Sequence, residues 1–163
     1  MPTLTLFCGL PGSGKTTMAK HLEADGAGVR ICTDDWHADL GVPHRDVGFH
    51  DRLQTVLYRH ALTLLEHGTD VIFEDGLWTR GERAEKVADA RLRGARVMLH
   101  VFEVPRDVLW VRLQKRNATA DAGAYPMSEE ELEGAWQIFQ APSATELADF
   151  DQVRLHTATN LGE

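Results

Sequence analysis

Hydrophobic and polar positions along this chain follow two spacings, one typical of buried strands and the other typical of helices. Short apolar runs predict five strands, at residues 4–8, 29–33, 70–73, 96–104 and 152–156. Between these runs, apolar periodicity and start and stop signals predict helices over residues 16–24, 50–67, 80–93, 105–117 and 128–140, with helical turns over 36–40 and 143–148. Because strands alternate with helices, we expect right-handed crossovers and a parallel sheet covered on both faces.

Several predicted boundaries carry specific signals. Gly68 and Gly94 follow the expected ends of two helices, where a left-handed glycine commonly stops the helix. Ser128 and Glu131 are three residues apart, which is the spacing of a capping box at a helix start. The helix over 80–93 is rich in charged residues, so we expect it to lie on the surface.

The segment 9–16 joins the first strand to the first helix, and it matches G-x-x-x-x-G-K-[ST] in the context that this motif requires. Its glycines let backbone N–H groups approach phosphate oxygens, and the helix N-terminus adds unpaired N–H groups and partial positive charge. Lys15 is expected to reach the β- and γ-phosphates, and the Thr16 hydroxyl to hold Mg²⁺. A glycine-rich turn followed by a lysine by chance is the alternative. The motif predicts a nucleoside triphosphate site at Gly9, Leu10, Pro11, Gly12, Ser13, Gly14, Lys15, Thr16 and Thr17.

Length and charge restrict the class of protein. The 163 residues suit one domain, which we take as residues 1–163. The 17 Lys and Arg are outnumbered by 25 Asp and Glu, and the net charge is −8. Because general nucleic-acid binders usually show a basic face, this balance argues against a long nucleic-acid partner and favours a small hydroxylated substrate. A local basic cleft remains compatible with it.

The sequence also bears on location. No apolar run approaches the ~20 residues of a membrane helix, and Met1 to Thr3 lead directly into the first strand, which leaves no room for a signal peptide. Cys8 and Cys32 lie in apolar runs, which favours buried, reduced thiols over a disulfide or a metal site. We therefore expect a cytoplasmic protein without a membrane partner, and the oligomeric state stays open.

Acidic residues follow three of the predicted strands, and ligands gather at the carboxyl edge of such a sheet. Asp34 and Asp35 end the second strand, Glu74 and Asp75 the third, and Glu103 the fourth. We expect one carboxylate of the Asp34–Asp35 pair to accept the proton of an attacking hydroxyl, while the other orients Mg²⁺ or caps the following turn. Helix capping by both residues is the structural alternative.

An apolar run that ends in an acid, Val71 to Asp75, is the Walker B pattern. An acid at this place can hold the metal directly or through its water shell. By itself this pattern is common at strand ends, but together with the loop at Gly9 it is a more specific indication of a nucleotide site. We expect Asp75, ahead of Glu74, to bind the metal together with Thr16.

Arg112 and Arg116 are four residues apart, so they project from one flank of the helix after Pro105. Both guanidinium groups are candidates for contact with the triphosphate, where they would take up transition-state charge, and a solvated basic face is the alternative. The segment 117–127 is polar and rich in small residues, so we expect it to be mobile. It fits a lid over approximately 117–142 that closes over the nucleotide and excludes water.

Two of the four tryptophans are candidates for the acceptor pocket. Trp36 and Trp78 each follow a strand-end acid, and core packing is the equally weighted alternative for both. Trp110 and Trp136 lie on helices and are assigned to packing. The eight histidines show no metal-binding spacing.

The order GLPGSGKTT, TDDW, VIFEDG and VPRDVLWVRLQKRN resembles the small P-loop kinases. The most similar groups are predicted ATP-binding kinases that resemble the polynucleotide 5′-hydroxyl kinase domain, with zeta toxins and chloramphenicol phosphotransferase more distant. The resemblance covers nearly the whole chain. It implies a three-layer α/β P-loop NTPase fold with a five-stranded parallel sheet and a small helical lid. It also implies phosphoryl transfer from ATP to a hydroxyl group.

By position, the resemblance assigns Lys15 and Thr16 to the loop, Asp34 to the base and Arg116 to the lid. Where polynucleotide kinases carry an arginine three residues after the first acid, this chain has His37, and this argues against a nucleic-acid acceptor. The expected catalytic residues are Asp34, Lys15 and Arg116, with Arg112 beside Arg116 on the nucleotide. The expected acceptor residues are Asp34, Asp35, Trp36, His37, Asp75 and Trp78.

Three functions follow from these patterns. The first is an ATP-dependent kinase for a small acceptor such as a nucleoside, sugar, metabolite or antibiotic. The second is a polynucleotide 5′-hydroxyl kinase, and the third is a regulatory ATP-binding NTPase without kinase activity. A guanine-reading [N/T]-K-x-D motif is absent from the sequence, which favours adenine over guanine. A toxin that acts on a cell-wall sugar precursor is a separate class.

Overall fold

Five parallel strands form one sheet in the computed structural model of this chain, which describes residues 1–119 and 125–159. The strands are β1 (Thr3–Cys8), β2 (Val29–Ile31), β3 (Val71–Phe73), β4 (Arg96–Glu103) and β5 (Gln152–Thr157). Their order is β2-β3-β1-β4-β5, and every neighbouring pair is parallel. The predicted five-stranded parallel sheet is confirmed, and the strand that precedes the glycine-rich loop lies at its centre.

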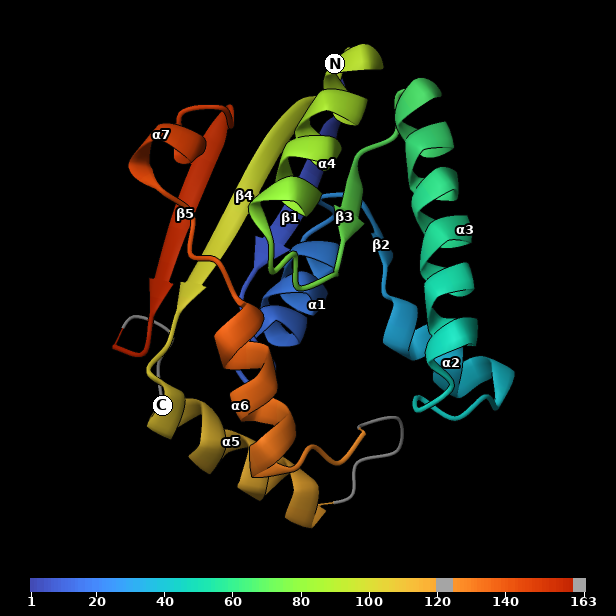
Figure 1. Cartoon of the computed structure of the whole chain (residues 1–163). Coiled ribbons are helices and arrows are strands. Elements are labelled where there is room, and N and C mark those ends of the chain that lie inside the picture. The colour runs from blue at the N-terminus through green and yellow to red at the C-terminus, as the bar shows by residue number, and fades with distance from the viewer. Residues whose placement is uncertain (120–124, 160–163) are drawn as a thin grey trace.

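Helices connect the strands and cover both faces of the sheet (Figure 1). They are α1 (Lys15–Ala24), α2 (Thr33–Leu40), α3 (Val47–Glu66), α4 (Arg80–Leu92), α5 (Arg106–Thr119), α6 (Glu129–Ile138) and α7 (Ala144–Leu147). On one face, α3 and α4 contribute Leu57, Leu65 and Val87 to the main apolar core. On the other face, α1 packs Ala19 against Phe7 of the central strand. The result is a three-layer α/β fold.

The central strand β1 is buried on both faces of the sheet, which explains its continuous apolar run. Leu4, Leu6 and Cys8 point toward the α3 and α4 side, whereas Phe7 points toward α1. Successive side chains of a strand alternate between faces, and both faces of this sheet are covered. Every residue from Leu4 to Cys8 is therefore buried.

Helices α5 and α6 pack around a second, smaller apolar cluster at the carboxyl edge of the sheet. Leu109 and Leu113 of α5 meet Leu132 and Ala135 of α6, and Leu10 of the glycine-rich loop joins them. The predicted capping box is present, because Ser128 and Glu131 exchange side-chain and backbone hydrogen bonds. The cluster thus attaches the two helices directly to the loop.

The segment expected to be mobile begins and ends with ordered contacts. The Asn117 amide donates to the Met127 carbonyl at 2.8 Å and accepts from the Met127 N–H at 3.2 Å. The rest of that expectation falls on residues 120–124, which lie outside the described residues.

One boundary differs from the sequence-based expectation. Strand β2 ends at Ile31 and α2 begins at Thr33, so Asp34 and Asp35 lie in the first turn of a helix rather than at a strand end. The Trp36 N–H donates to the Cys32 carbonyl and closes this turn. Acidic side chains are favourable there because they face the positive end of the helix dipole. Since helical side chains diverge by ~100° per residue, the two carboxylates point in different directions.

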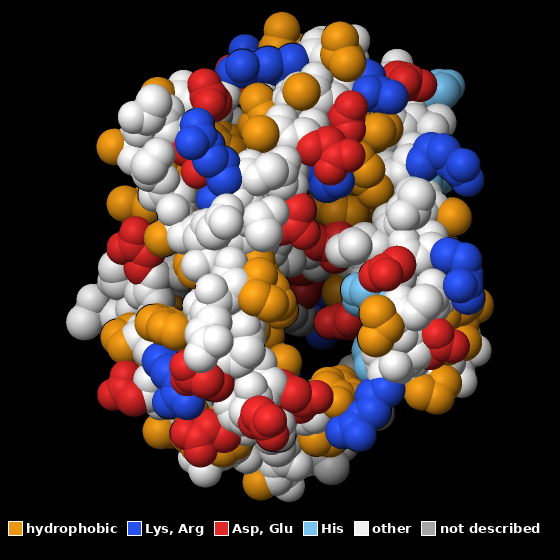
Figure 2. Space-filling model, viewed as in Figure 1, with side chains coloured by type: hydrophobic (Ala, Val, Ile, Leu, Met, Phe, Trp, Pro, Cys, Tyr) orange, Lys and Arg blue, Asp and Glu red, His pale blue; other side chains and the backbone are white. Residues whose placement is uncertain are grey.

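The surface shows a hollow between α6 and the α2–α3 side of the molecule, with acidic and histidine side chains on its walls (Figure 2). Acidic side chains also gather over α6 in this view. Cys8 and Cys32 are buried free thiols, as expected. Within residues 1–119 and 125–159, no helix is long and apolar enough to cross a membrane.

Candidate active site

The glycine-rich loop runs from the end of β1 to the start of α1. Gly14 precedes the helix with a φ of 105°, and Gly12 has a φ of 81°, values that L side chains rarely adopt. An added Cβ at Gly12 would approach Leu113 of α5 to 3.0 Å, so the loop packs closely on that helix.

Several polar atoms of this loop have no acceptor or donor in the described part of the chain. They are the buried hydroxyl of Ser13 and the N–H groups of Gly14, Lys15, Thr16 and Thr17. Unsatisfied N–H groups at a helix N-terminus, together with the helix dipole, are suited to bind phosphate oxygens. The loop therefore fits the triphosphate group that its sequence predicts.

Lys15 is half-buried, and its Nζ donates to the Leu10 carbonyl at 2.9 Å across the loop. Burial lowers the pKa of Lys15 to about 8, and the carboxylates of Glu74 and Asp34 oppose this shift. Its amine therefore lies in the loop with two acids near enough to act on it electrostatically, one at the end of β3 and one in α2.

A chain of side-chain contacts extends from Thr16 to Asp35. The Thr16 hydroxyl donates to Glu74 Oε1 at 2.5 Å, and Arg30 Nε donates to Glu74 Oε2 at 2.6 Å. A second nitrogen of Arg30 donates to Asp35 Oδ2 at 2.7 Å. Burial alone would lower the pKa of Arg30, but the hydrogen bond to Asp35 and the charge of Glu74 raise it, so the guanidinium stays charged.

This arrangement differs from the expected metal pair. The structure brings Glu74, rather than Asp75, to the Thr16 hydroxyl. Asp75 instead accepts hydrogen bonds from Gln54 at 3.0 Å and from Thr33 at 3.3 Å. Burial raises the pKa of Asp75 to about 6, against the effect of these two donors. Successive residues beyond a strand point to opposite sides, so only one of the two acids can face the loop.

The surroundings also test the fit of Mg²⁺. A hydroxyl and a carboxylate in contact, next to a phosphate-binding loop, are the oxygen ligands that Mg²⁺ prefers when phosphates and waters complete its shell. Thr16 and Glu74 supply them. No group of three or more His, Cys, Asp or Glu that could hold a metal by itself occurs among the described residues.

Asp34 and Asp35 have different environments. The side chain of Asp35 is held by Arg30, whereas that of Asp34 is 68% exposed and lies 3.6 Å from His44 Nδ1. Asp34 also interacts electrostatically with Lys15 and with Arg116. The structure therefore leaves Asp34 as the carboxylate that is accessible beside the loop.

The two arginines of α5 are both half-buried. Arg116 donates to the Tyr125 carbonyl at 3.4 Å, and its buried Nε has no partner within the described ranges. Burial lowers the pKa of Arg116, and the charge of Asp34 opposes this. No hydrogen bond or ion pair joins the Arg112 side chain to another described side chain.

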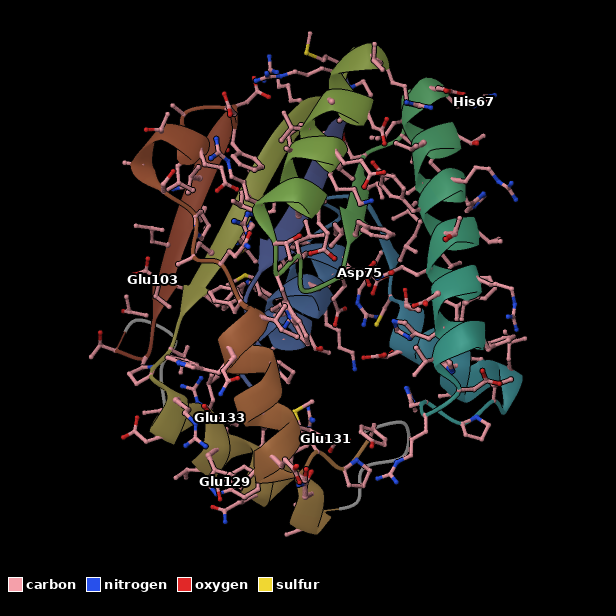
Figure 3. The ribbon with its side chains drawn as sticks, in the orientation of Figure 1. His67, Asp75, Glu103, Glu129, Glu131 and Glu133 are labelled. Carbon is pink, nitrogen blue, oxygen red and sulfur yellow. The ribbon has the colours of Figure 1, made fainter. Side chains whose placement is uncertain are left out.

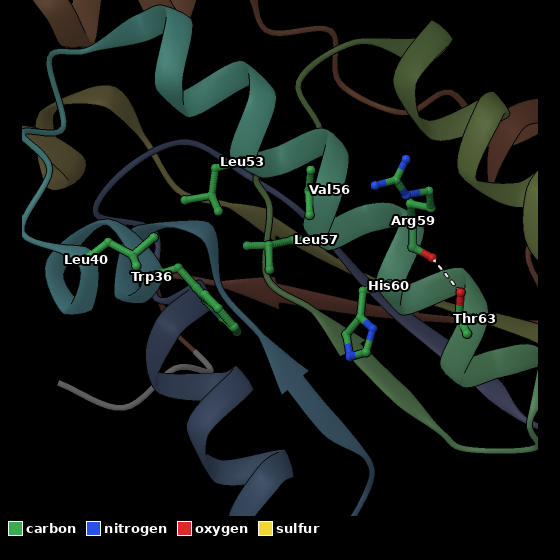
Figure 4. Close-up of a pocket in the computed structure, with 8 residues that line it drawn as sticks. All are labelled: Trp36, Leu40, Leu53, Val56, Leu57, Arg59, His60 and Thr63. Carbon is green, nitrogen blue, oxygen red and sulfur yellow. Dashed lines mark hydrogen bonds between the residues drawn. The ribbon is translucent and has the colours of Figure 1, made fainter.

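The candidate acceptor residues separate in space. Trp36 faces α3 across an apolar groove of about 460 Å³ between α2 and α3, and none of residues 9–17 lines this groove (Figure 4). His37 is completely buried, so it is not accessible to an acceptor. Trp78 is half-buried against the α5–α6 cluster, and its indole nitrogen lies against Gly76, whose carbonyl accepts from Gly9 of the loop.

The strand-end acids are likewise distributed along the edge. In Figure 3, Asp75 lies at the centre of the molecule, whereas Glu103 lies on the β4–β5 flank, and Glu129, Glu131 and Glu133 belong to α6. Glu103 is exposed at the end of β4. Of the acids predicted at strand ends, Glu74 contacts the loop residue Thr16, and Asp34 acts electrostatically on Lys15.

Sequence reasoning missed three polar contributors to this site. Arg30 was hidden within an apolar run, Gln54 within a helix whose apolar stripe dominated its pattern, and His44 within a loop. Each acts through a partner distant in the chain or outside its own element. Only the unusual place of an arginine inside a short strand was a usable signal.

Comparisons with known proteins agree with this fold. A family model described as an AAA domain matches residues 4–142. No curated protein matches the sequence. A candidate kinase from Chloroflexus aurantiacus is 18% identical with a TM-score of 0.74, over 99% of this chain and 91% of that one.

Two further solved structures are similar. A gluconokinase from Sinorhizobium meliloti is 14% identical with a TM-score of 0.63, over 98% of this chain and 84% of that one. A chain of the Pnkp1/Rnl/Hen1 RNA repair complex is 22% identical with a TM-score of 0.70, over 92% of this chain but only 46% of that one. At these identities the similarities establish the P-loop fold that the resemblance implied.

Proposed function

The chain belongs to the AAA domain family, and from this premise we propose that it is an ATP-dependent kinase that phosphorylates a hydroxyl group of a small acceptor. One observation carries the proposal: Lys15, Thr16 and Glu74 lie at the same edge of the sheet as the accessible carboxylate of Asp34. Lys15, Thr16 and Glu74 are enough for a protein that only binds a nucleotide. Phosphoryl transfer to an alcohol also requires a base, and the exposed carboxylate of Asp34 can serve as one.

The loop holds the triphosphate in this proposal. The N–H groups of residues 14–17 donate to phosphate oxygens, and Lys15 exchanges the Leu10 carbonyl for the β- and γ-phosphates. Thr16 and Glu74 hold Mg²⁺, which neutralises phosphate charge when it is bound. Arg30 keeps Glu74 in place through its buried guanidinium.

The transfer step uses Asp34 as base. Asp34 takes the proton of the acceptor hydroxyl, the acceptor oxygen forms a bond to the γ-phosphorus, and the bond to the β–γ bridging oxygen breaks to release ADP. Lys15 and Arg116 hold the charge that develops on the transferred group. Asp35 does not act as the base, because its carboxylate accepts a hydrogen bond from Arg30.

Support for a small acceptor comes from His37 and from charge. His37, which stands where polynucleotide kinases carry an arginine, is buried and offers no cation to a substrate phosphate. The net charge of −8 disfavours a polyanion. Similarity to a gluconokinase fits this reading. Similarity to a chain of the RNA repair complex favours a second candidate, a polynucleotide 5′-hydroxyl kinase.

The test is an ADP-release and phosphate-transfer screen over sugars, nucleosides, antibiotics, other metabolites and an oligonucleotide that ends in a 5′-hydroxyl. We expect a phosphorylated small molecule. Asp34→Asn should bind Mg-ATP nearly normally and lose about 10²–10⁴-fold in turnover, because a positioned base contributes that much. Asp35→Asn should lose clearly less, and Asp39→Asn, an exposed change on the same helix, should match the wild type.

The alternatives give different results in the same screen. Transfer to the oligonucleotide alone identifies a polynucleotide kinase. ATP turnover that no alcohol accelerates identifies a regulatory NTPase. Equal turnover of wild type and Asp34→Asn on a confirmed acceptor shows that Asp34 is not the base.

A further inference from the structure

We propose that His44 is a positioning residue for Asp34: its Nδ1–H holds one carboxylate oxygen, and this directs the other toward the acceptor hydroxyl. The inference rests on the proposed function, because it deepens the role of Asp34 as base. It concerns a residue in the loop between α2 and α3 that no sequence motif marks.

The contact itself is specific. His44 Nδ1 lies 3.6 Å from Asp34 Oδ1, and within the described ranges no other side chain lies at ion-pair distance from Asp34. The distance is slightly longer than a hydrogen bond. Catalytic hydrogen bonds are often long before the substrate binds and tighten in the reactive complex.

The ring of His44 is held in place by a column of aromatic rings. It stacks on His37 with centroids 5.0 Å apart and an interplanar angle of 22°. His37 is completely buried, with its Nδ1 3.3 Å from the Val42 carbonyl and its Nε2 3.2 Å from His50. On another side, the His44 and Tyr125 centroids are 6.2 Å apart. Packing on several sides removes rotamer freedom, which is what a positioning residue requires.

The surroundings of His44 assign its proton. Nδ1 faces a carboxylate, whereas Nε2 is buried without a hydrogen-bond partner in the described part of the chain. A proton on Nδ1 has an acceptor, while a proton on Nε2 would be buried and unpaired, which is costly. We therefore place the ring proton on Nδ1, where it faces Asp34.

Charged groups around Asp34 explain why a donor that restrains its carboxylate is useful. Lys15 and Arg116 attract the carboxylate electrostatically, and Asp75 interacts with it as a like charge. A freely rotating Asp34 would turn toward the two cations and pair with them instead of meeting the acceptor. When the contact with His44 tightens to a hydrogen bond, it restrains one oxygen, so the other remains available to take the proton.

The matched substitutions are His44→Asn and His44→Gln. An asparagine amide reaches approximately the place of Nδ1, whereas a glutamine amide reaches that of Nε2. With Mg-ATP and water as the acceptor, and with any alcohol from the screen, we expect His44→Gln to lose about tenfold in kcat at an unchanged KM for ATP. His44→Asn should stay within about threefold of the wild type. His60→Asn, an exposed change on α3, is the control.

A double mutant tests whether His44 acts through Asp34. If it does, Asp34→Asn with His44→Gln should be no slower than Asp34→Asn alone, because the positioned group is already lost. Independent losses that multiply, or equal losses in the Asn and Gln variants, would assign His44 to structure only and overturn the proposal.

A readout without turnover separates this inference from the kinase function. The ¹³C chemical shift of the Asp34 carboxyl is recorded at neutral pH in the absence of nucleotide. A hydrogen bond polarises the carboxylate that accepts it, so this chemical shift should change in His44→Gln and stay in place in His44→Asn and His60→Asn. A chemical shift that does not change in any variant overturns the proposal. If it changes but no alcohol is phosphorylated, the contact stands and the kinase function fails.

Discussion

At the residue scale, Lys15 shows how burial and charge compete in the loop. Burial lowers its pKa to about 8, whereas Glu74 and Asp34 favour the charged form. Bound phosphates would favour that form further. The protonation state of Lys15 before binding therefore contributes to the affinity for Mg-ATP.

We predict that Lys15→Ala weakens Mg-ATP binding by about 1.5–3 kcal/mol, because it removes a charge-assisted phosphate contact. In the wild type, binding should weaken about tenfold between pH 7 and pH 9, because Lys15 loses its proton as the pH rises through about 8. Calorimetric titrations at several pH values measure both effects. Lys20→Ala, an exposed change in α1, is the control, and an unaltered pH dependence in Lys15→Ala would contradict the assignment.

At the element scale, one buried ion pair joins α4, α7 and the end of β1. Arg83 is completely buried, and its guanidinium donates to both carboxylate oxygens of Glu146 at 2.5 and 3.1 Å. The same group donates to the Leu77 carbonyl at 3.1 Å and contacts Cys8 Sγ at 3.5 Å. The helix that was predicted to lie on the surface therefore contributes a core residue.

We predict that Glu146→Gln destabilises the fold by about 3–5 kcal/mol, because it leaves the buried Arg83 charge uncompensated. The double change Arg83→Met with Glu146→Leu should recover much of this loss, because it removes both charges. Urea unfolding measures the free energies. Arg80→Met, at an exposed position of α4, should change stability by no more than about 0.5 kcal/mol.

Helices α5 and α6 are joined by polar side-chain contacts. Arg106 of α5 forms ion pairs with Glu133 at 2.6 Å and Glu129 at 3.3 Å of α6, so the two helices are connected at one end. At the other end, Arg116 contacts the backbone of Tyr125. The lid over approximately 117–142, which includes α6, stays a prediction.

We predict that Arg116→Ala lowers turnover by about 10²–10³-fold while it weakens Mg-ATP binding much less, because its charge stabilises the transition state. Steady-state kinetics and calorimetry on the same variant separate the two quantities. Lys115→Ala, an exposed neighbour, serves as the control. An unchanged turnover number would assign Arg116 to the solvated face of α5.

At the scale of the whole molecule, Asp75 links three elements and makes stability depend on pH. It follows β3 and accepts hydrogen bonds from Thr33 of α2 and Gln54 of α3. Its pKa is raised from the ordinary value of 3.8 to about 6 by burial. A carboxyl group with a raised pKa stabilises the fold in its protonated form. That contribution is fully present below about pH 4 and is lost as the pH rises through about 6.

We predict that Asp75→Asn, which stays neutral, raises the melting temperature relative to the wild type, and that the difference grows from pH 4 to pH 7. Thermal melts at matched ionic strength over this range measure it. Asp39→Asn, an exposed change, should show no such trend. A constant difference between Asp75→Asn and the wild type would mean that folding does not raise the pKa of Asp75.

The sequence alone determined the features whose physical causes are local. The glycine-rich loop, the five strands, the parallel sheet and the Ser128–Glu131 capping box depend on residues a few positions apart, or on periodicity within one element. The predicted end of β2 was wrong by two residues, because acidic residues after an apolar run are compatible both with a strand end and with the first turn of a helix.

Only the tertiary structure decided which distant side chains meet. Thr16 and Glu74 are 58 residues apart, Arg30 and Glu74 44 apart, and Arg83 and Glu146 63 apart. One residue of register at the end of β3 determines whether Glu74 or Asp75 faces Thr16, and neither composition nor spacing contains that information. Chain packing creates these pairs, because a buried charge is retained only where the fold brings it a partner.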